Sequence, residues 1–389
     1  MNKYVLNSLI FLITCFQFNI ASAESWPQAS DYFQSSLSKL GIVGGSAVFI
    51  SNQGDSKSIH FGMADIDKGY PITDKTLYHW ASITKTFTGI AIMQLRDQQK
   101  LKLSDPIIQY LPEITQFHNP YQNTGDITIE HLLTHSAGFR MSSFPFKTQS
   151  WQPHEPAEFS QLVAMFPYSE IKFNPGTQYS YSNLGINFLG EIIKRITGDS
   201  IESYIDKNIF KPLEMHTAYF NSTPFHLSKY RSNNYAFVNG KFMSGGPEFN
   251  TGITSANGGI NASITDMTKY VLFLIGDDKK PIYDDVLKRT SLLEMWAPRL
   301  TTGTGKHQHI GLTFFNRQIY KQTYIGHTGS QKNFYSSMFI NPEAKTGHLF
   351  VYNTSKLVPN QDGIKIATTM PTYRAIQSKL FGIMKKQHN

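Results

Sequence analysis

Runs of apolar residues near the start of the chain predict two strands joined by a turn. Residues 47–50 are continuously apolar, as in a strand buried on both faces. Residues 52–55, Asn-Gln-Gly-Asp, are typical of a turn, and we expect the returning strand over 58–62. An amphipathic helix is expected before these strands, ending at Leu40.

The middle of the chain has the apolar spacing of helices. The clearest case predicts a helix over 184–196, where apolar residues recur at intervals of three and four and Gly198 follows as a C-cap. Two further helix starts are marked by polar residues at capping spacing, namely Asp199 with Glu202 and Ser263 with Asp266.

The last part of the chain returns to strands. A turn is expected at 342–345 and a final helix over 372–384. The strand-like runs before that helix are spaced as in an antiparallel meander, and they cover 309–315, 322–327, 335–340 and 348–352.

One sheet built from both ends of the chain, with helices inserted between them, explains this order. The predicted fold class is therefore α+β, with a single domain over 24–389. Its α/β part is expected over about 24–80 and 265–389, and its helical part over about 81–264.

The first residues have the layout of a secretory signal peptide. Lys3 precedes a mostly apolar stretch over 5–18, and Ala21-Ser22-Ala23 matches a cleavage signal, so we expect cleavage after Ala23 and a periplasmic or secreted protein. A membrane anchor is the alternative, but the apolar run is short for a spanning helix. A lipoprotein is a smaller alternative, because residues 12–15 end in Cys15 and resemble a lipobox.

Cys15 is the only cysteine, so cleavage would leave a chain without disulfides, a thiolate nucleophile or cysteine metal ligands. The formal net charge of +8 is spread along the chain, and no basic stripe or aromatic motif typical of nucleic-acid binding is present. We expect no nucleic-acid partner, and at most a loose association with anionic envelope surfaces.

Ser82-Ile83-Thr84-Lys85 is the first candidate for chemistry. If Ser82 lies in the first turn of a helix, Lys85 lies one turn further on the same face, where its amine can reach the hydroxyl. A serine needs a base before it can attack a carbonyl, and a lysine can be that base if burial lowers its pKa. The backbone N–H groups at a helix start could also hold an oxyanion.

Two later stretches complete a set of three. Tyr181-Ser182-Asn183 precedes the predicted helix and offers a phenol for proton transfer and an amide for binding a substrate amide. His327-Thr328-Gly329-Ser330 ends a strand-like run and offers hydroxyls, an imidazole and backbone that a ligand could approach closely at glycine.

These three motifs, in this order, resemble those of the serine hydrolases that recognise penicillin. Further stretches at 132–138, 173–176 and 258–260 are similar to the same family, which includes class C β-lactamases, DD-peptidases and related esterases. The resemblance spans about residues 30–355 and implies the β-lactamase/transpeptidase-like fold.

The resemblance also implies roles for the motif residues. Ser82 would form an acyl-enzyme, with Lys85, Tyr181 or both moving its proton, and the N–H groups of Ser82 and Ser330 would hold the oxyanion. Asn183 would position the acyl side chain. A substrate carboxylate would meet His327, Thr328, Gly329 and Ser330. No metal and no organic cofactor are required.

The motif chemistry leaves several substrates open. A lysine is usual in class C β-lactamases where this chain has His327, so the resemblance favours the DD-carboxypeptidase branch, acting on peptides that end in D-amino acids. Esterases of the family also have this histidine, so a small ester remains an alternative substrate. A β-lactamase, or a penicillin-binding protein that turns over slowly, is the third alternative. Asn333 stands where the family pattern has glycine.

Three other patterns mimic functional motifs. Lys345-Thr346-Gly347 spells the lysine form of the third motif but is expected in a hairpin turn. Ser136 follows His135 but no G-x-S-x-G nucleophile elbow surrounds it, and the chain lacks that elbow altogether, which argues against an α/β-hydrolase. His307 and His309 share a strand face without a third metal ligand in view, so a solvent-facing pair is favoured over a zinc site.

Overall fold

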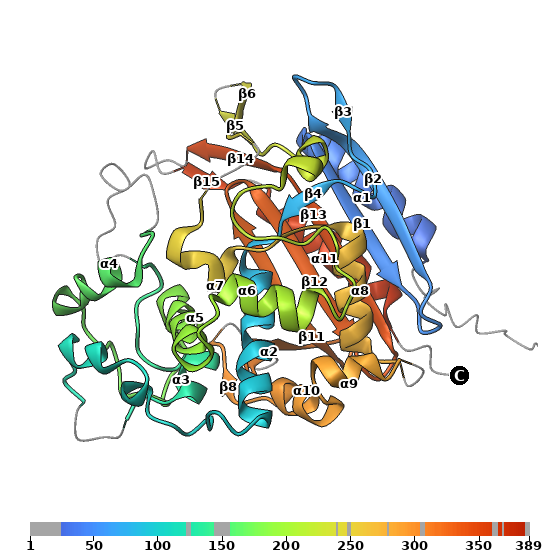
Figure 1. The fold of residues 1–389 in the computed structure, drawn as a ribbon. Coiled ribbons are helices and arrows are strands. Elements are labelled where there is room, and N and C mark those ends of the chain that lie inside the picture. The colour runs from blue at the N-terminus through green and yellow to red at the C-terminus, as the bar shows by residue number, and fades with distance from the viewer. Residues whose placement is uncertain are drawn as a thin grey trace, which may run out of the picture.

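A nine-stranded sheet built from both ends of the chain forms the centre of the molecule (Figure 1). Its strand order is β3-β2-β1-β13-β12-β11-β10-β9-β8, and β1 pairs antiparallel with β13, with Gly45 opposite Tyr352. The α+β class and the sheet shared by both termini are therefore confirmed.

This computed structural model describes residues 25–121, 126–143, 156–238, 240–246, 250–277, 280–303, 308–359, 365–367 and 369–385. Within these ranges, no helix combines the length and the apolar character needed to cross a bilayer. The predicted signal peptide lies outside them.

The strands are β1 (Gly44–Ile50), β2 (Ser56–Asp65), β3 (Tyr70–Pro71), β4 (Leu77–His79), β5 (Tyr235–Val238), β6 (Lys241–Ser244), β7 (Asn261–Ser263), β8 (Leu300–Thr301), β9 (Gln308–Ile310), β10 (Phe315–Ile319), β11 (Gln322–Gln331), β12 (Phe334–Asn341), β13 (Thr346–Tyr352), β14 (Thr354–Pro359) and β15 (Lys365–Ala367). The α-helices are α1 (Trp26–Leu40), α2 (Thr84–Asp97), α3 (Ile129–Leu133), α4 (Phe159–Val163), α5 (Asn183–Thr197), α6 (Ile201–Ile205), α7 (Ser255–Gly258), α8 (Ile264–Ile275), α9 (Ile282–Val286), α10 (Arg289–Trp296) and α11 (Met370–Ile383).

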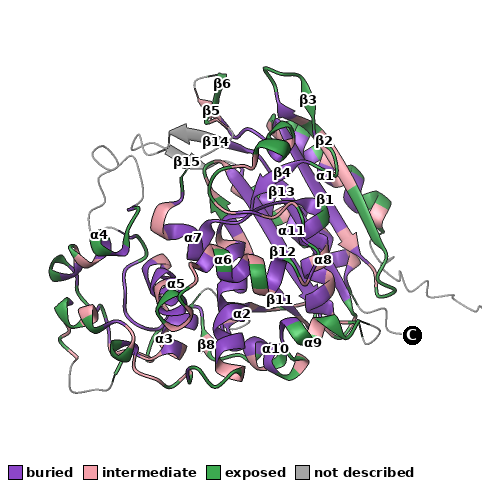
Figure 2. Cartoon of the chain, viewed as in Figure 1, coloured by how far each residue is buried: buried purple, intermediate pink, exposed green. Residues whose placement is uncertain are grey.

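The two faces of the sheet pack against different helices. On β13, Leu349 and Val351 belong to the core shared with α2 and α8, whereas Phe350 and Tyr352 pack with residues of α1 and α11. This alternation follows from the two-residue period of a strand. Every residue of β12 and β13 is buried, because both faces of these two strands are covered (Figure 2).

Helix α2 lies inside the molecule. Every residue from Thr84 to Leu95 is buried, and the ring of Phe87 stacks on that of Tyr270 in α8, with centroids 3.8 Å apart. A helix that is enclosed on all sides cannot tilt freely, since each displacement would open voids in a close-packed core. The S-x-x-K motif thus stands at the start of a rigidly held helix.

The predicted boundaries need three corrections. The run 309–315 is not one strand but β9 and β10, separated by a tight turn in which the Gly311 N–H donates to the Phe314 carbonyl and Thr313 has a φ of 64°. Helix α6 is capped by Ser200, whose hydroxyl accepts from the Ser203 N–H, rather than by Asp199. The largely helical middle also contains the β5–β6 hairpin, which the apolar pattern did not predict.

Two predicted caps are confirmed. Gly198 ends α5 in the left-handed region, with a φ of 79°. Ser263 caps α8 by accepting the Asp266 N–H.

The departure at Asn333 has a simple structural basis. Lys332 and Asn333 join β11 to β12 in a two-residue turn, and both have positive φ, at 48° and 65°. Asparagine tolerates this left-handed conformation better than other residues with a side chain. Its amide also donates to Asn234 Oδ1 at 2.8 Å, which ties the hairpin to the segment before β5.

We predict that Asn333→Ala destabilises the protein more than Asn333→Gly. Both variants lose the hydrogen bond to Asn234, but only alanine pays the left-handed strain of about 1 kcal/mol or more. Urea unfolding of the two variants beside the wild type measures the difference. Equal midpoints for the alanine and glycine variants would show that the turn geometry does not select this residue.

Candidate active site

Ser82 and Lys85 are brought together at the start of α2. Ser82 lies in the 3-10 turn η1 (Ala81–Ile83), which leads directly into the helix. The Lys85 amine donates to Ser82 Oγ at 3.1 Å and to the Asn257 carbonyl at 2.7 Å. The contact expected from the spacing of the two residues is therefore present.

The environment of Lys85 changes its protonation. The side chain is completely buried, and burial lowers its pKa well below the usual value for lysine. Among the described residues, the hydrogen-bond partners of the amine are a hydroxyl and a carbonyl, neither of which carries a negative charge. A neutral amine can keep its lone pair for the Ser82 proton.

The turn that carries Ser82 is held in an uncommon conformation. Ala81 has a φ of 51°, which is strained for a residue with a Cβ. Two hydrogen bonds fix its neighbour Trp80: the backbone N–H donates to the Ile260 carbonyl at 2.9 Å, and the indole N–H donates to the Ala262 carbonyl at 3.0 Å. The segment around β7 therefore holds the turn in place.

Tyr181 reaches the same point from the loop before α5. Its hydroxyl hydrogen-bonds Ser82, and Lys85 Nζ lies 5.0 Å from the centre of its ring. Burial of the hydroxyl raises the Tyr181 pKa, and the hydrogen bond from Ser82 opposes this only in part. Tyr181 is therefore a neutral phenol that can donate its proton and accept another during catalysis, and it is not ionised in the free protein.

His135 supports Tyr181, and the motif comparison assigned it no role. Its ring lies 4.5 Å from the Tyr181 ring, and its Nδ1 accepts the Ser182 N–H at 3.2 Å. Burial, together with Lys85 and His327, lowers the His135 pKa well below normal, so the imidazole is neutral and its proton lies on Nε2. The only signal for it in the sequence was its place within the family-like stretch 132–138.

Asn183 is the first residue of α5, and Ser182 caps that helix by accepting the Gly185 N–H at 2.9 Å. The Asn183 N–H donates to the Met141 carbonyl at 2.9 Å, which fixes its backbone. Its Oδ1 is buried and has no hydrogen-bond partner among the described residues. A buried acceptor in this state is suited to a ligand N–H.

Asn257 is a second residue that the sequence did not single out. Its carbonyl accepts from Lys85, and its side-chain amide donates to Asn187 Oδ1 in α5 at 2.6 Å. It connects the helix that carries Lys85 with the helix that follows Tyr181. Because Lys85 is recognised through a backbone carbonyl, no residue type marks this role in the sequence.

His327 lies on the face of β11 that turns toward η1, but it is not a cation. It is buried, its ring lies 5.0 Å from Phe315 and 6.1 Å from Tyr181, and its Nδ1–H donates to the Thr328 carbonyl. Burial, with a further contribution from Lys85, lowers its pKa to about 3. The expected contact between His327 and a substrate carboxylate would therefore lack a positive charge in the free protein.

Thr328 and Ser330 also differ from the prediction. Each lies opposite a residue whose side chain faces α1 and α11, Thr328 opposite Ser337 and Ser330 opposite Tyr335. The Thr328 side chain hydrogen-bonds Tyr373 in α11. Since neighbouring residues of a strand face opposite sides, the two hydroxyls cannot share the face of His327.

Gly329 is required by the protein's own packing. A Cβ at this position would lie 2.4 Å from the Trp80 carbonyl oxygen and 2.3 Å from Ser336 Oγ. The sequence predicted that a ligand would come close to the backbone at this glycine. In the structure it is the turn carrying Ser82 that comes close, because β11 packs against it.

With this geometry described, the comparisons with known proteins identify the family. A family model described as Beta-lactamase matches residues 30–369. The chain belongs to the β-lactamase family. "Protein flp" of Staphylococcus aureus strain MW2 is 25% identical over 340 residues, which cover 86% of this chain and 65% of that protein. This chain thus spans about two thirds of the length of such curated relatives.

Solved structures share the fold. The octameric penicillin-binding protein homologue from Pyrococcus abyssi superposes with a TM-score of 0.75 at 24% identity, covering 90% of this chain and 76% of that one. A D-stereospecific amidohydrolase from Streptomyces sp. gives a TM-score of 0.70 at 21% identity, covering 84% and 93%. At these identities the likeness concerns the fold alone.

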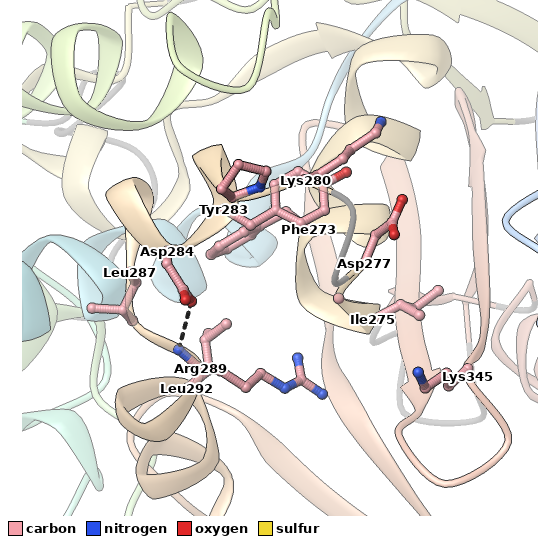
Figure 3. A pocket seen from close by; sticks show the side chains of 12 residues that line it. Phe273, Ile275, Asp277, Lys280, Tyr283, Asp284, Leu287, Arg289, Leu292 and Lys345 are labelled. Atoms are coloured by element: carbon pink, nitrogen blue, oxygen red, sulfur yellow. Dashed lines mark hydrogen bonds between the residues drawn. The ribbon is translucent and has the colours of Figure 1, made fainter.

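The patterns that mimic family motifs lie elsewhere. Lys345 is in the turn before β13 and lines a pocket between α8, α9 and α10, in which the Arg289 N–H donates to Asp284 (Figure 3). None of the predicted site residues lines this pocket. Ser136 is buried and hydrogen-bonds Thr134. His307 lies outside the described residues, and no metal-binding cluster occurs within them.

We predict that Gly329→Ala slows the reaction of Ser82 with a fluorophosphonate probe on the order of 10–100-fold, because the new Cβ pushes β11 away from η1. Gly198→Ala is the control, since Gly198 has no atom within 4 Å of its Cβ position and only its φ of 79° opposes the substitution. The control should lose stability without slower labelling. Labelling of Gly329→Ala at the wild-type rate would refute the packing argument.

Proposed function

We propose that this protein hydrolyses small acyl substrates through an ester formed on Ser82. The observation that carries the proposal is the buried amine of Lys85, which lies 3.1 Å from Ser82 Oγ and whose pKa is strongly lowered by burial. A serine beside a neutral amine in a water-poor site is an activated nucleophile.

The proton path follows from the protonation states. Ser82 Oγ attacks the carbonyl carbon while its proton passes to Lys85 Nζ, and the carbonyl oxygen becomes an oxyanion. Tyr181 then gives its phenolic proton to the leaving group and is reprotonated from Lys85, which restores both neutral groups. Water attacks the ester by the same path in reverse, and the acid and Ser82 are released.

Backbone groups are suited to hold the oxyanion. The pairing of β10 with β11 ends at Gly326, opposite Phe315, so β10 does not cover the edge of residues 327–331. We assign the oxyanion to the N–H groups of Ser82 and Ser330, a role that does not require the Ser330 hydroxyl. The Asn183 amide, with its unpartnered Oδ1, would position the acyl side chain.

The first candidate substrate is a peptide that ends in D-amino acids, as for a DD-carboxypeptidase. The Tyr181-Ser182-Asn183 and His327-Thr328-Gly329 motifs support it, and so does the fold shared with a D-stereospecific amidohydrolase. The signal-peptide pattern ending at Ala23 supports export to the compartment where such peptides occur. We propose no metal or cofactor for this reaction and no nucleic-acid partner.

The second candidate is an ester or amide without a free carboxylate beside the scissile bond. One observation favours it: burial lowers the pKa of each of the three site residues that could carry positive charge, Lys85, His135 and His327. A carboxylate would then be bound by hydrogen bonds alone. A β-lactam, whose carboxylate needs the same recognition, should react slowly.

We predict that the acylation rate rises with pH and levels off well below pH 10.5, the ordinary lysine pKa. The neutral form of Lys85 is the active one, so activity is lost as the pH falls through its lowered pKa. His327 should add no inflection near neutrality, because its pKa is about 3. Stopped-flow acylation across pH measures this profile. A midpoint near 10.5 would contradict the neutral-lysine mechanism.

We predict that Ser82→Ala abolishes turnover of every substrate while leaving the fold intact. Turnover of a D-Ala-D-Ala peptide, a nitrophenyl ester and a chromogenic cephalosporin, measured side by side, separates the candidates. Faster turnover of the ester than of the peptide at every pH would replace the peptidase proposal by the esterase one. A covalent label on Ser136, or full activity without Ser82, would refute the acyl-enzyme itself.

A further inference from the structure

Exposed apolar side chains gather on three neighbouring segments of the chain. We name as the apolar edge the five large apolar residues Ile66, Tyr70, Phe225, Phe242 and Met243. They account for five of the eleven such residues that are exposed in the described part of the chain. Phe225 is 95% exposed and Met243 59%, which is unusual for side chains of this size.

Hydrogen bonds place these segments along one border. The turn η7 (Phe225–Tyr230) leads into residues 231–234, which run between β4 and β2. Along that run the Ser232 N–H donates to the Leu77 carbonyl at 3.0 Å, and the Asn233 N–H donates to the Ala64 carbonyl at 2.9 Å. The β5–β6 hairpin follows at once.

The β5–β6 hairpin is also joined directly to the β2–β3 turn. The Ile66 N–H donates to the Tyr235 hydroxyl at 2.8 Å. Figure 1 shows β3 and the β5–β6 hairpin rising from the same side of the molecule.

Ring contacts within the β5–β6 hairpin hold one of its exposed apolar residues, Phe242, in position. The ring of Phe242 packs edge-on against Phe237, with centroids 5.0 Å apart, and lies 6.4 Å from Tyr235. All residues of β6 are exposed, so this strand offers both of its faces to solvent (Figure 2). Phe242 is still 42% exposed despite this packing, and Met243 is 59% exposed, so both leave apolar surface in contact with water in the free protein.

Lysines accompany each of the three segments. Lys68 lies 5.9 Å from the Tyr70 ring, Lys229 lies 4.9 Å from the Tyr230 ring, and Lys241 directly precedes Phe242. Aromatic rings beside lysines are typical of surfaces that sit in the headgroup region of a bilayer, with the rings in the interface and the amines at the phosphates. Asp65 and Asp67 reduce the positive charge near Lys68.

We propose that the apolar edge docks onto an anionic phospholipid bilayer, with Phe225, Phe242 and Met243 inserting into the interface and Lys229 and Lys241 meeting the phosphates. A bilayer accepts separate projecting tips, whereas a protein partner requires a continuous complementary face. The net charge of +8 favours the same partner.

Docking would also set the position of the active site relative to the bilayer. Asn234, in the run between η7 and β5, accepts from Asn333 at the end of the β11 hairpin. This hydrogen bond joins the segment before β5 to the turn after β11, the strand that carries Gly329 and Ser330. This inference concerns a different surface and stands whether or not Ser82 is the nucleophile.

The test is co-sedimentation of the full chain with vesicles. Vesicles of phosphatidylglycerol mixed with phosphatidylcholine should bind the protein, salt should weaken this binding, and phosphatidylcholine alone should bind it poorly. The triple variant Phe225→Ser/Phe242→Ser/Met243→Ser should bind the anionic vesicles less tightly, on the order of tenfold. Lys229→Glu/Lys241→Glu should lower binding to the anionic vesicles only.

Tyr168→Ser/Ile282→Ser/Leu293→Ser is the matched control, because it removes three apolar side chains that are exposed by 68%, 42% and 51% at other places. It should bind as the wild type does. Unchanged circular dichroism spectra and urea unfolding midpoints of both triple variants would show that they fold. Equal loss of binding in the two triple variants, or none in the first, overturns the proposal. The wild type could instead self-associate without binding vesicles. If only the first triple variant abolished that self-association, the partner of the apolar edge would be a second copy of the chain.

Discussion

The site depends on keeping one lysine uncharged inside the protein. An ammonium group can be buried only at a high cost unless it is paired with a negative charge, so the favourable state of an unpaired buried lysine is the neutral amine. Lys85 is such a lysine: it is buried, and its hydrogen-bond partners among the described residues are a carbonyl and a hydroxyl. Protonation would place a charge where nothing compensates it, so burial lowers the affinity of the amine for a proton. The amine takes the serine proton only during the reaction, when the oxyanion that forms beside it compensates the new charge.

The surrounding fold keeps water away from that amine. Helix α2 is buried along most of its length, α7 supplies the Asn257 carbonyl, and the rings of Tyr181 and His135 close the side toward α5. Three segments distant in sequence must therefore meet at one nitrogen. The strained Ala81 is consistent with this demand, since the turn has to place Ser82 against an amine whose position is fixed by the core.

The sequence predicted the parts of the site whose chemistry is carried by residue type. Ser82, Lys85, Tyr181 and Asn183 occur in recognisable motifs, and the first three meet as expected. Asn257 was missed because its contribution to Lys85 is a backbone carbonyl, which every residue has. Thr328 and Ser330 were misplaced because the motif was treated as four consecutive ligands, although alternation along β11 separates them from His327.

The same distinction applies to the fold. Long periodic segments such as α5 and the strands that enclose the core were predicted because burial on one or two faces leaves a pattern. The β5–β6 hairpin left none, since β6 covers no core and its apolar residues face solvent. A cap one residue from the expected one, Ser200 in place of Asp199, cannot be chosen by spacing alone because both side chains can accept the same kind of hydrogen bond.

A neutral site also constrains how substrates are distinguished. With Lys85, Tyr181, His135 and His327 all uncharged, a carboxylate entering the site would lose hydration without gaining an ion pair. It could be retained only by donors that point at it, and the hydroxyl of Thr328 is turned toward Tyr373. Selection then falls to shape and to the acyl side of the substrate, where the unpartnered Asn183 oxygen offers a specific contact. The pKa of His327 could rise again only if a bound carboxylate compensated for its burial, so binding of an anionic substrate would be coupled to proton uptake at this histidine.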